Sequence, residues 1–396
     1  MVSGMGGISI GKESCTGCGA CRSICPKGAI SMAADEEGFC YPSVNEGKCV
    51  RCGKCISVCP AMGDGQNGDF NRICRENQKD GEKGAGHSPE VYAAWSMNPK
   101  IRYESTSGGI FSELALAVLE DGGYICGAAY ADGHMVKHCI ANTKEGLDKL
   151  RQSKYVQSDM GGSYDEICGI LQQGKALLFC GTPCQCEGVL KFCKEKKTDI
   201  SSLYLVDFIC RGISSPKVYR KYLGEMETRY GSAIKRVWFK NKTYGWNYFC
   251  TKLEFENGES YLQDRFHDAY VRGYIEENLY LRLSCGKCKF KGFRRSADIT
   301  LADFWGVKVQ GAGNGGGDIS EQGISMVMPH TRKGKSLWDR IMPHVYWEEK
   351  RLQDVQLGNI CFEHSIRHGE YRGKFMEDLD KMPVIENIER FLRNGL

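Results

Sequence analysis

Residues 15–26 read CTGCGACRSICP, and residues 49–60 read CVRCGKCISVCP. Both segments follow the pattern C-x2-C-x2-C-x3-C-P, so the first sixty residues contain an internal repeat built on thiols. Three closely spaced thiolates can wrap one face of an iron–sulfur cubane, which needs four cysteines in all. Tetrahedral zinc sites usually contain paired C-x-x-C knuckles, and a run of three closely spaced cysteines that ends in Cys-Pro is not typical of them. The repeat therefore predicts iron–sulfur chemistry.

This repeat resembles a bacterial two-cluster ferredoxin, in which the fourth cysteine of each run ligates the other cluster. The resemblance implies an α+β ferredoxin-like dicluster domain over residues 1–63. The implied ligands of one 4Fe–4S cluster are Cys15, Cys18, Cys21 and Cys59. Those of the second cluster are Cys49, Cys52, Cys55 and Cys25.

The length, net charge and cysteine content of the chain limit the classes of function that it can have. The chain has 396 residues, enough for two or three domains, and its net charge of +4 gives no indication of nucleic acid or an anionic membrane as a partner. No apolar run approaches the roughly 18 residues of a spanning helix, and the N-terminus lacks an export signal, so we expect a cytoplasmic protein. The 22 cysteines, several in tight C-x-x-C pairs, indicate metal–sulfur chemistry in a reducing compartment rather than disulfides.

The remainder of the chain has the pattern of an α/β domain. Residues 64–89 are rich in glycine, asparagine and charge, which predicts a linker. A strand over 91–97, a helix within 105–123 and a strand over 124–130 then follow in order. Residues 105–109, STSGG, put small hydroxyls and bare backbone at the start of that helix, where free N–H groups could bind phosphate. An ordinary serine N-cap is the alternative.

Several segments resemble, in order, the coenzyme F-420 hydrogenase/dehydrogenase β-subunit family. They are STSGGIFSELALAVLEDGG (105–123), RQSKYVQS (151–158), GTPCQ (181–185), CRGISSPKVYRKYL (210–223) and SCGKCKFKGFRRSADITLADFWG (284–306). The chain is similar to bacterial members fused to a two-cluster ferredoxin. The resemblance implies an α/β flavin- and 4Fe–4S-binding domain. Its implied parts are an N-terminal subdomain over 90–175, a C-terminal subdomain over 176–345 and a helical segment over 346–396.

The same resemblance implies FAD and a third 4Fe–4S cluster. The implied cluster ligands are Cys184, Cys210, Cys285 and Cys288. A four-cysteine zinc site and inert core thiols stay open as alternatives, because the C-x-x-C pair alone would also suit zinc. The implied flavin contacts are Ser105, Ser107, Gly108, Gly109, Ser153, Lys154, Tyr155 and Gln157. Asp303 and Trp305 join them, because a strand-end turn with a carboxylate and a large aromatic side chain suits flavin binding. A solvated surface lysine at Lys154 and a packing corner at Asp303 and Trp305 are the alternatives.

Two further groups receive structural interpretations. Cys180, Cys186 and Cys193 are predicted to be core or surface thiols. His364, Arg367, His368 and Arg372 can share one face of a helix. A solvated basic face is the favoured interpretation, and contact with substrate or flavin is the alternative. The glycine-rich segment GAGNGG (311–316) is not followed by a helix, so it is not a dinucleotide-binding motif.

The expected function is transfer of electrons between the clusters and a flavin that exchanges hydride with a small organic acceptor, such as a deazaflavin. The expected protein partner is a ferredoxin or a hydrogenase/dehydrogenase subunit. An electron-transfer subunit without its own substrate is one alternative, and a zinc-stabilised binding module is another. No residue is assigned a catalytic role from the sequence.

Overall fold

The computed structural model of the chain describes residues 7–62, 89–310 and 319–392. The glycine-rich segment 311–316 and the predicted linker, apart from Pro89, lie outside the described residues. Within these ranges, no helix combines the length and the apolar character needed to cross a membrane.

The N-terminal domain consists of two short helices and a two-stranded antiparallel sheet. Helices α1 (Ala20–Ser23) and α2 (Lys54–Ser57) each follow a glycine with left-handed backbone, Gly19 at φ 78° and Gly53 at φ 75°. Glycine adopts this conformation without the steric cost that a Cβ would bring. Strands β1 (Ile30–Ala34) and β2 (Cys40–Val44) pair between the two helices in the chain. The domain thus has the α+β character that the repeat predicts.

The main domain is built on one eight-stranded mixed sheet in the order β13-β3-β12-β11-β7-β6-β4-β5. Its four central strands β11, β7, β6 and β4 are parallel, and the outer strands pair antiparallel. The strands are β3 (Val91–Ser96), β4 (Tyr124–Tyr130), β5 (Val136–Ala141), β6 (Leu177–Cys180), β7 (Leu203–Phe208), β11 (Ile299–Asp303), β12 (Ser325–Pro329) and β13 (Val345–Lys350). The strands predicted over 91–97 and 124–130 are confirmed.

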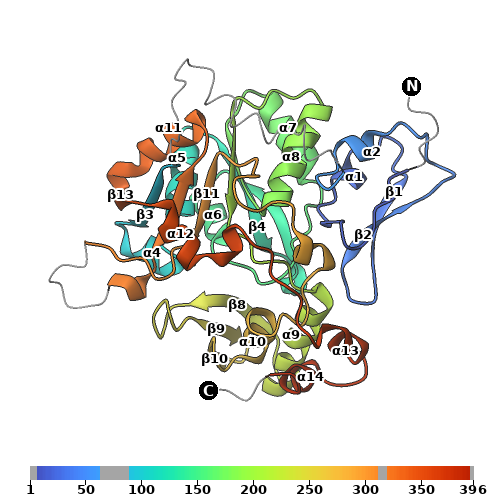
Figure 1. The fold of residues 1–396 in the computed structure, drawn as a ribbon, viewed down its shortest axis with the longest axis vertical. Helices are drawn as coiled ribbons and strands as arrows, with labels where there is room; N and C mark the ends of the chain where they lie inside the picture. The colour runs from blue at the N-terminus through green and yellow to red at the C-terminus, as the bar shows by residue number, and fades with distance from the viewer. Residues whose placement is uncertain (1–6, 63–88, 311–318, 393–396) are drawn as a thin grey trace.

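Helices cover both faces of this sheet (Figure 1). Helices α5 (Ile110–Glu120), α6 (Lys144–Leu150) and α11 (Arg332–Ile341) lie on one face, and α7 (Ser163–Gln172) and α8 (Pro183–Glu195) lie on the other. Successive strand residues serve opposite faces, as the pleat requires. Leu178 belongs to the core with α5 and α11, whereas Phe179 belongs to the core with α7 and α8.

A smaller lobe follows β7 in the chain. It contains the antiparallel sheet β10-β9-β8, with β8 (Ile234–Asn241), β9 (Cys250–Phe255) and β10 (Ser260–Asp264). Helices α9 (Pro216–Tyr230), α10 (Ala269–Ile275), α13 (Arg372–Glu377) and α14 (Val384–Glu389) share its apolar core. In Figure 1 the lobe lies below the main sheet.

One sheet spans the boundary that the sequence predicts within the main domain. Strands from both expected subdomains, 90–175 and 176–345, form one sheet, so the sheet does not divide at residue 176. The segment expected to be helical from residue 346 begins inside strand β13, which pairs with β3. Trp95 of β3 stacks on Tyr346 of β13 at 4.1 Å between ring centroids, and this packing holds the edge strand in place. Helix α12 (Leu352–Gly358) follows.

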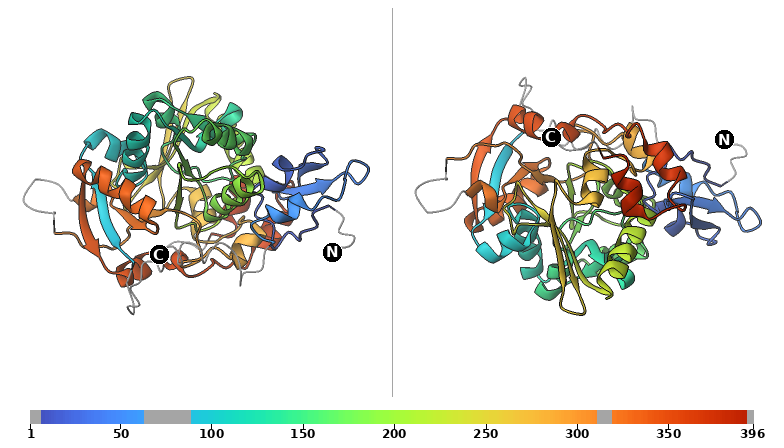
Figure 2. Two further views of the ribbon diagram at one scale, coloured as in Figure 1. Left: turned by 90° about the horizontal axis from the view of Figure 1, so that it is seen from above. Right: turned by 90° about the horizontal axis from the view of Figure 1, so that it is seen from below.

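The ferredoxin-like domain packs against one end of the main domain, beside α7 and α8 (Figures 1 and 2). Ile24 and Val58 of the small domain share an apolar core with Val189 and Phe192 of α8. This burial fixes the position of the small domain relative to α8.

Candidate functional site

The first cysteine group implied by the repeat, Cys15, Cys18, Cys21 and Cys59, is brought together in a buried position. Burial, and then the neighbouring Cys18, raises the pKa of the Cys59 thiol to about 11. Burial followed by the charges of Cys18, Cys15 and Cys59 raises the pKa of Cys21 as well. Four thiols with no competing ligand type are the donor set of a 4Fe–4S cluster, and a bound cation would reverse these pKa shifts.

The second group, Cys25, Cys49, Cys52 and Cys55, lines one small surface cavity. Cys52 is exposed, and Cys55 is buried. Each of the two groups thus takes its fourth cysteine from the other run, as the ferredoxin pattern expects. Across the ranges that the structure describes, no three His, Cys, Asp or Glu side chains are positioned to hold one metal ion. In a cubane the cysteines instead surround a cluster of four irons.

The third group comes from three separate parts of the main domain. Cys184 lies in the first turn of α8, Cys210 follows β7, Cys285 lies in the 3-10 helix η2 (Leu283–Lys287), and Cys288 ends that helix. Burial, and then the nearby Cys285, raises the pKa of Cys210 to about 12. Burial raises the pKa of Cys184, to which the charges of Cys288 and Cys210 contribute. The four thiols implied for a third cluster therefore lie near enough for their charges to affect one another's pKa.

Helix α8 connects the first and third cysteine groups. Cys184 stands at its start, and the charge of Cys18 also raises the pKa of Cys184. One turn later, a Cβ added at Gly188 would lie 3.6 Å from the Cys18 Sγ and 2.9 Å from the Tyr164 hydroxyl oxygen. Tyr164 donates its hydroxyl hydrogen to the Cys18 carbonyl oxygen at 3.0 Å. The small residue at 188 thus permits close approach of the two domains.

Polar side chains complete the contact between the domains. Gln157, expected at the flavin, instead donates to the carbonyl oxygens of Thr16 and Gly17, each at 3.3 Å. Arg372, expected on a solvated basic face, is buried and pairs with Glu37 of the small domain, with Nη1 to Oε1 at 3.0 Å. For Arg372 that expectation was wrong, because its side chain docks the ferredoxin-like domain, whereas His364 and Arg367 are exposed.

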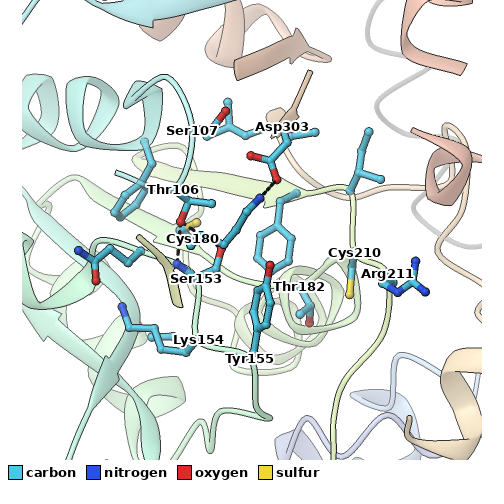
Figure 3. Close-up of a pocket in the computed structure, with 18 of the residues that line it drawn as sticks. Thr106, Ser107, Ser153, Lys154, Tyr155, Cys180, Thr182, Cys210, Arg211 and Asp303 are labelled. Atoms are coloured by element: carbon cyan, nitrogen blue, oxygen red, sulfur yellow. Dashed lines mark hydrogen bonds and ion pairs between the residues drawn. The ribbon is translucent and has the colours of Figure 1, made fainter. Parts of the chain in front are cut away.

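A cavity of about 480 Å³ lies at the carboxyl ends of the central parallel strands, between the main sheet and the smaller lobe. Its wall includes Cys180 at the end of β6, Asp207 near the end of β7 and Asp303 at the end of β11. We call it the strand-end cavity (Figure 3). Open α/β sheets bind ligands at this edge, and the volume is within the range of cofactor pockets.

Most of the expected flavin contacts line the strand-end cavity, namely Ser105, Ser107, Gly109, Ser153, Lys154, Tyr155, Asp303 and Trp305. Gly108 is not among the lining residues. It lies against the sheet, where an added Cβ would meet the Ala94 carbonyl oxygen at 2.4 Å. Neither Gly108 nor Gln157 therefore reaches the cavity that the other expected residues share.

The Lys154 side chain is hydrogen-bonded to main-chain carbonyl oxygens. Its Nζ donates to the carbonyl oxygens of Leu150 and Arg151, at 3.1 and 2.5 Å, and so caps the C-terminus of α6. Burial lowers the pKa of Lys154 to about 7. Next to it in the chain, Tyr155 stacks on Phe239 of β8 at 5.2 Å between centroids. This pair fixes the loop against the smaller lobe.

Several residues at the strand-end cavity were not predicted from the sequence. Lys240 of β8 forms an ion pair with Asp303 and lies 4.7 Å from the centroid of the Trp305 ring. Trp305 stacks on Trp246 at 4.3 Å, and the Arg265 guanidinium lies 5.8 Å from the Trp305 ring. A lysine inside the apolar run VWFKNK was the available signal for Lys240.

Two buried polar atoms on cavity residues lack partners among the described residues. They are Nδ1 of His138 and Nε of Arg211. Burial lowers the pKa of His138 to about 4, so its ring is neutral near pH 7. With Nε2 placed 3.3 Å from the Cys180 carbonyl oxygen, Nδ1 is left as an acceptor. A polar ligand in the cavity would satisfy such atoms, and FAD offers both donors and phosphate acceptors.

Comparison with known proteins agrees with this architecture. Residues 91–163 and 174–355 match the N-terminal and C-terminal parts, respectively, of the family described as "Coenzyme F420 hydrogenase/dehydrogenase, beta subunit". Residues 14–62 match a 4Fe-4S dicluster domain. No curated protein sequence matches the chain.

One similar solved structure is a xenon derivative of the F420-reducing NiFe hydrogenase complex from Methanosarcina barkeri. The alignment has 19% identity and a TM-score of 0.46, and it covers 77% of this chain and 91% of that one. On the family matches, this chain is an iron–sulfur protein that belongs to the coenzyme F420 hydrogenase/dehydrogenase beta subunit family and carries an N-terminal 4Fe-4S dicluster domain.

Proposed function

We propose that this protein is an iron–sulfur flavoprotein oxidoreductase with three 4Fe–4S clusters and an FAD bound in the strand-end cavity. Its substrate would be a small organic hydride acceptor, of which a deazaflavin is one candidate. The observation that carries the proposal is the position of Cys210. This residue belongs to the third cysteine group and also lines the strand-end cavity. The proposed third-cluster site and a cofactor-sized cavity would therefore share a wall.

The arrangement of the thiols supports a path between the two domains. Cys18 of the first group approaches Cys184 of the third along α8, and Cys210 continues from the third group to the cavity. When bound, 4Fe–4S clusters carry single electrons and a flavin converts them to two-electron hydride chemistry. The protein contributes fixed positions and exclusion of water.

The polar lining of the strand-end cavity supports FAD as the occupant. Arg211 and Arg265 supply guanidinium groups, which suit a pyrophosphate. Trp305 and Tyr155 supply aromatic surface beside Asp303. Thr106 accepts a hydrogen bond from the Ser153 main-chain N–H at 2.8 Å, which ties the STSGG loop to the segment that contains Tyr155. These residues would bind and orient the cofactor.

The cavity favours an enzyme over an electron-transfer subunit without its own substrate, because a transfer subunit needs no space beside its clusters. A ferredoxin or a hydrogenase/dehydrogenase subunit would supply or take up the electrons. That either of these proteins is the electron-transfer partner is part of the proposal.

The test is purification without oxygen followed by denaturing release of the cofactor. We expect a brown protein that releases FAD, identified by mass, at about one molecule per chain. Reconstitution with added FAD controls for loss during purification. A brown protein that neither releases FAD nor binds it on reconstitution would refute the flavin part of the proposal, while iron and acid-labile sulfide would report on the clusters separately.

A further inference from the structure

The twelve predicted cluster ligands differ in their access to solvent. Cys15, Cys18, Cys21 and Cys59 of the first group are buried, whereas Cys52 of the second group is the one exposed residue among the twelve. Electron transfer between proteins requires a short distance between redox centres. The surface around Cys52 is therefore where an external electron carrier can come closest to the second group.

Positive charge surrounds this surface. Lys27, Arg51 and Lys54 line the same small cavity as the four cysteines of the second group, and Lys48 directly precedes Cys49. All four cations are exposed. We call them, together with the intervening Val50, the basic rim.

Most cations of the basic rim form no ion pair with a described residue. Within the described part of the chain, Lys54 lies 3.8 Å from Glu195, while Lys27, Lys48 and Arg51 make no ion pair. Glu46 is an exposed acid in the neighbouring turn, so the rim keeps a surplus of positive charge. The whole chain carries only +4, so this surplus is a local feature. Val50, at 56% exposure, adds an apolar contact of the kind found inside protein interfaces.

We propose that the basic rim docks a small acidic electron-carrier protein whose own redox centre is ringed by carboxylates. Opposite charges steer two such proteins together and orient their redox centres. One electron passes from the reduced carrier to the oxidised cluster held by Cys25, Cys49, Cys52 and Cys55, and no bond or proton is exchanged. The inference rests on the proposed function only in that these thiols hold a 4Fe–4S cluster.

Stopped-flow reduction without oxygen tests the inference, with reduced plant-type 2Fe–2S ferredoxin, an acidic protein, as the probe. The test variant is the double charge reversal Lys27→Glu/Arg51→Glu. The matched control is Lys100→Glu, an exposed lysine at the start of α4 (Pro99–Glu104), far from the ferredoxin-like domain in Figure 1. We expect the double reversal to lower the second-order rate constant about tenfold at low salt. The difference should shrink at high salt, where the Debye length falls to about 3 Å. The control should behave as the unmodified protein.

Dithionite reduction and iron content separate docking from cluster loss. In the double reversal the iron content should be unchanged and excess dithionite should still reduce the clusters fully, even though added negative charge beside the second group lowers its reduction potential. If that variant loses iron, the neutral pair Lys27→Gln/Arg51→Gln replaces it. The readout is cluster absorbance. Absence of FAD would therefore refute the flavin proposal and leave the docking proposal unaffected. Equal rate loss in Lys100→Glu, or an unchanged rate in the double reversal, would overturn the docking surface.

Discussion

Arg282 donates a hydrogen bond from Nε to the carbonyl oxygen of Cys15 at 2.8 Å, across 267 residues of sequence. Its Nη2 lies 3.6 Å from the Cys15 Sγ and donates to the Cys40 carbonyl oxygen at 2.9 Å, and Nη1 donates to Gln157 at 3.0 Å. The side chain is 1% exposed. A single buried guanidinium thus joins the first cysteine group to the loop that carries Cys285 and Cys288.

The substitution Arg282→Ala should loosen this junction. It leaves one buried and two part-buried acceptors without a donor, so we expect the free energy of unfolding to fall by about 3 kcal/mol. If the first group holds a 4Fe–4S cluster, loss of a fixed positive charge beside Cys15 should also lower its reduction potential, because reduction adds negative charge. Urea titration and a redox titration followed by electron paramagnetic resonance measure the two effects.

Lys287→Ala is the matched control for that junction. Lys287 lies in the same loop and pairs with Glu13 of the small domain at 2.8 Å, but both side chains are more than two-thirds exposed. Exposed ion pairs contribute little, so neither stability nor potential should change measurably. If the two variants behaved alike, the special role of the buried guanidinium would be disproved.

Cys184→Ser should remove the third cluster. Analysis of iron in protein purified without oxygen should then fall from about twelve to about eight atoms per chain. Cys186→Ala, two residues along the same helix, is the control. Cys186 is fully buried, and its Sγ lies 3.6 Å from the Val206 carbonyl oxygen, so it is a packing residue. Retention of about twelve irons in Cys184→Ser would remove the assignment of this cysteine.

Gly109→Ala tests the loop at the start of α5. Gly109 has φ +92°, and an added Cβ would meet Ile101 at 3.1 Å and Ser96 at 3.3 Å. We expect a loss of about 1–3 kcal/mol in the free energy of unfolding, and weaker retention of FAD if the loop binds it. Gly169→Ala within α7, where a Cβ meets nothing within 4 Å, should instead add about 0.5–1 kcal/mol. Equal effects of the two changes would contradict the strain at Gly109.

Local patterns predicted local structure well. Helix α5 and strands β3 and β4 lie where apolar periodicity placed them. The cysteine groups could be predicted because metal–sulfur spacing leaves a dense signature in a few residues. Their ligation stays a prediction that iron analysis can test.

Contacts between residues far apart in the sequence could not be predicted from local patterns. The pairing of β13 with β3 joins segments about 250 residues apart, and nothing in the residues 346–350 distinguishes an edge strand from the helices that follow. Arg282 and Arg372 resemble surface cations in the sequence, because their acceptors Cys15 and Glu37 lie in another domain. Lys240 likewise meets Asp303 only after the smaller lobe folds over the main sheet.

Asp268 gives the smaller lobe a dependence on pH. It is buried at the start of α10, where it accepts hydrogen bonds from the Val271 main-chain N–H at 2.7 Å and from the hydroxyls of Tyr222 and Tyr261 at 2.9 and 3.0 Å. Burial outweighs these donors and raises the pKa of Asp268 to about 6. The folded protein therefore holds a proton on this carboxyl over a pH range in which the unfolded chain has released it.

Stability owed to this proton should be complete below about pH 4 and lost as the pH rises through about 6. Relative to Asp268→Asn, which does not titrate, the unmodified protein should lose about 1 kcal/mol of unfolding free energy between pH 5 and pH 6. Above pH 7 the difference should level off, because both states are then ionised. Urea titrations at pH 5, 6, 7 and 8 measure it, with the exposed Asp132→Asn as a control that should follow the unmodified protein. A difference independent of pH across this range would mean that Asp268 is ionised in the folded protein, and that its three donors outweigh its burial.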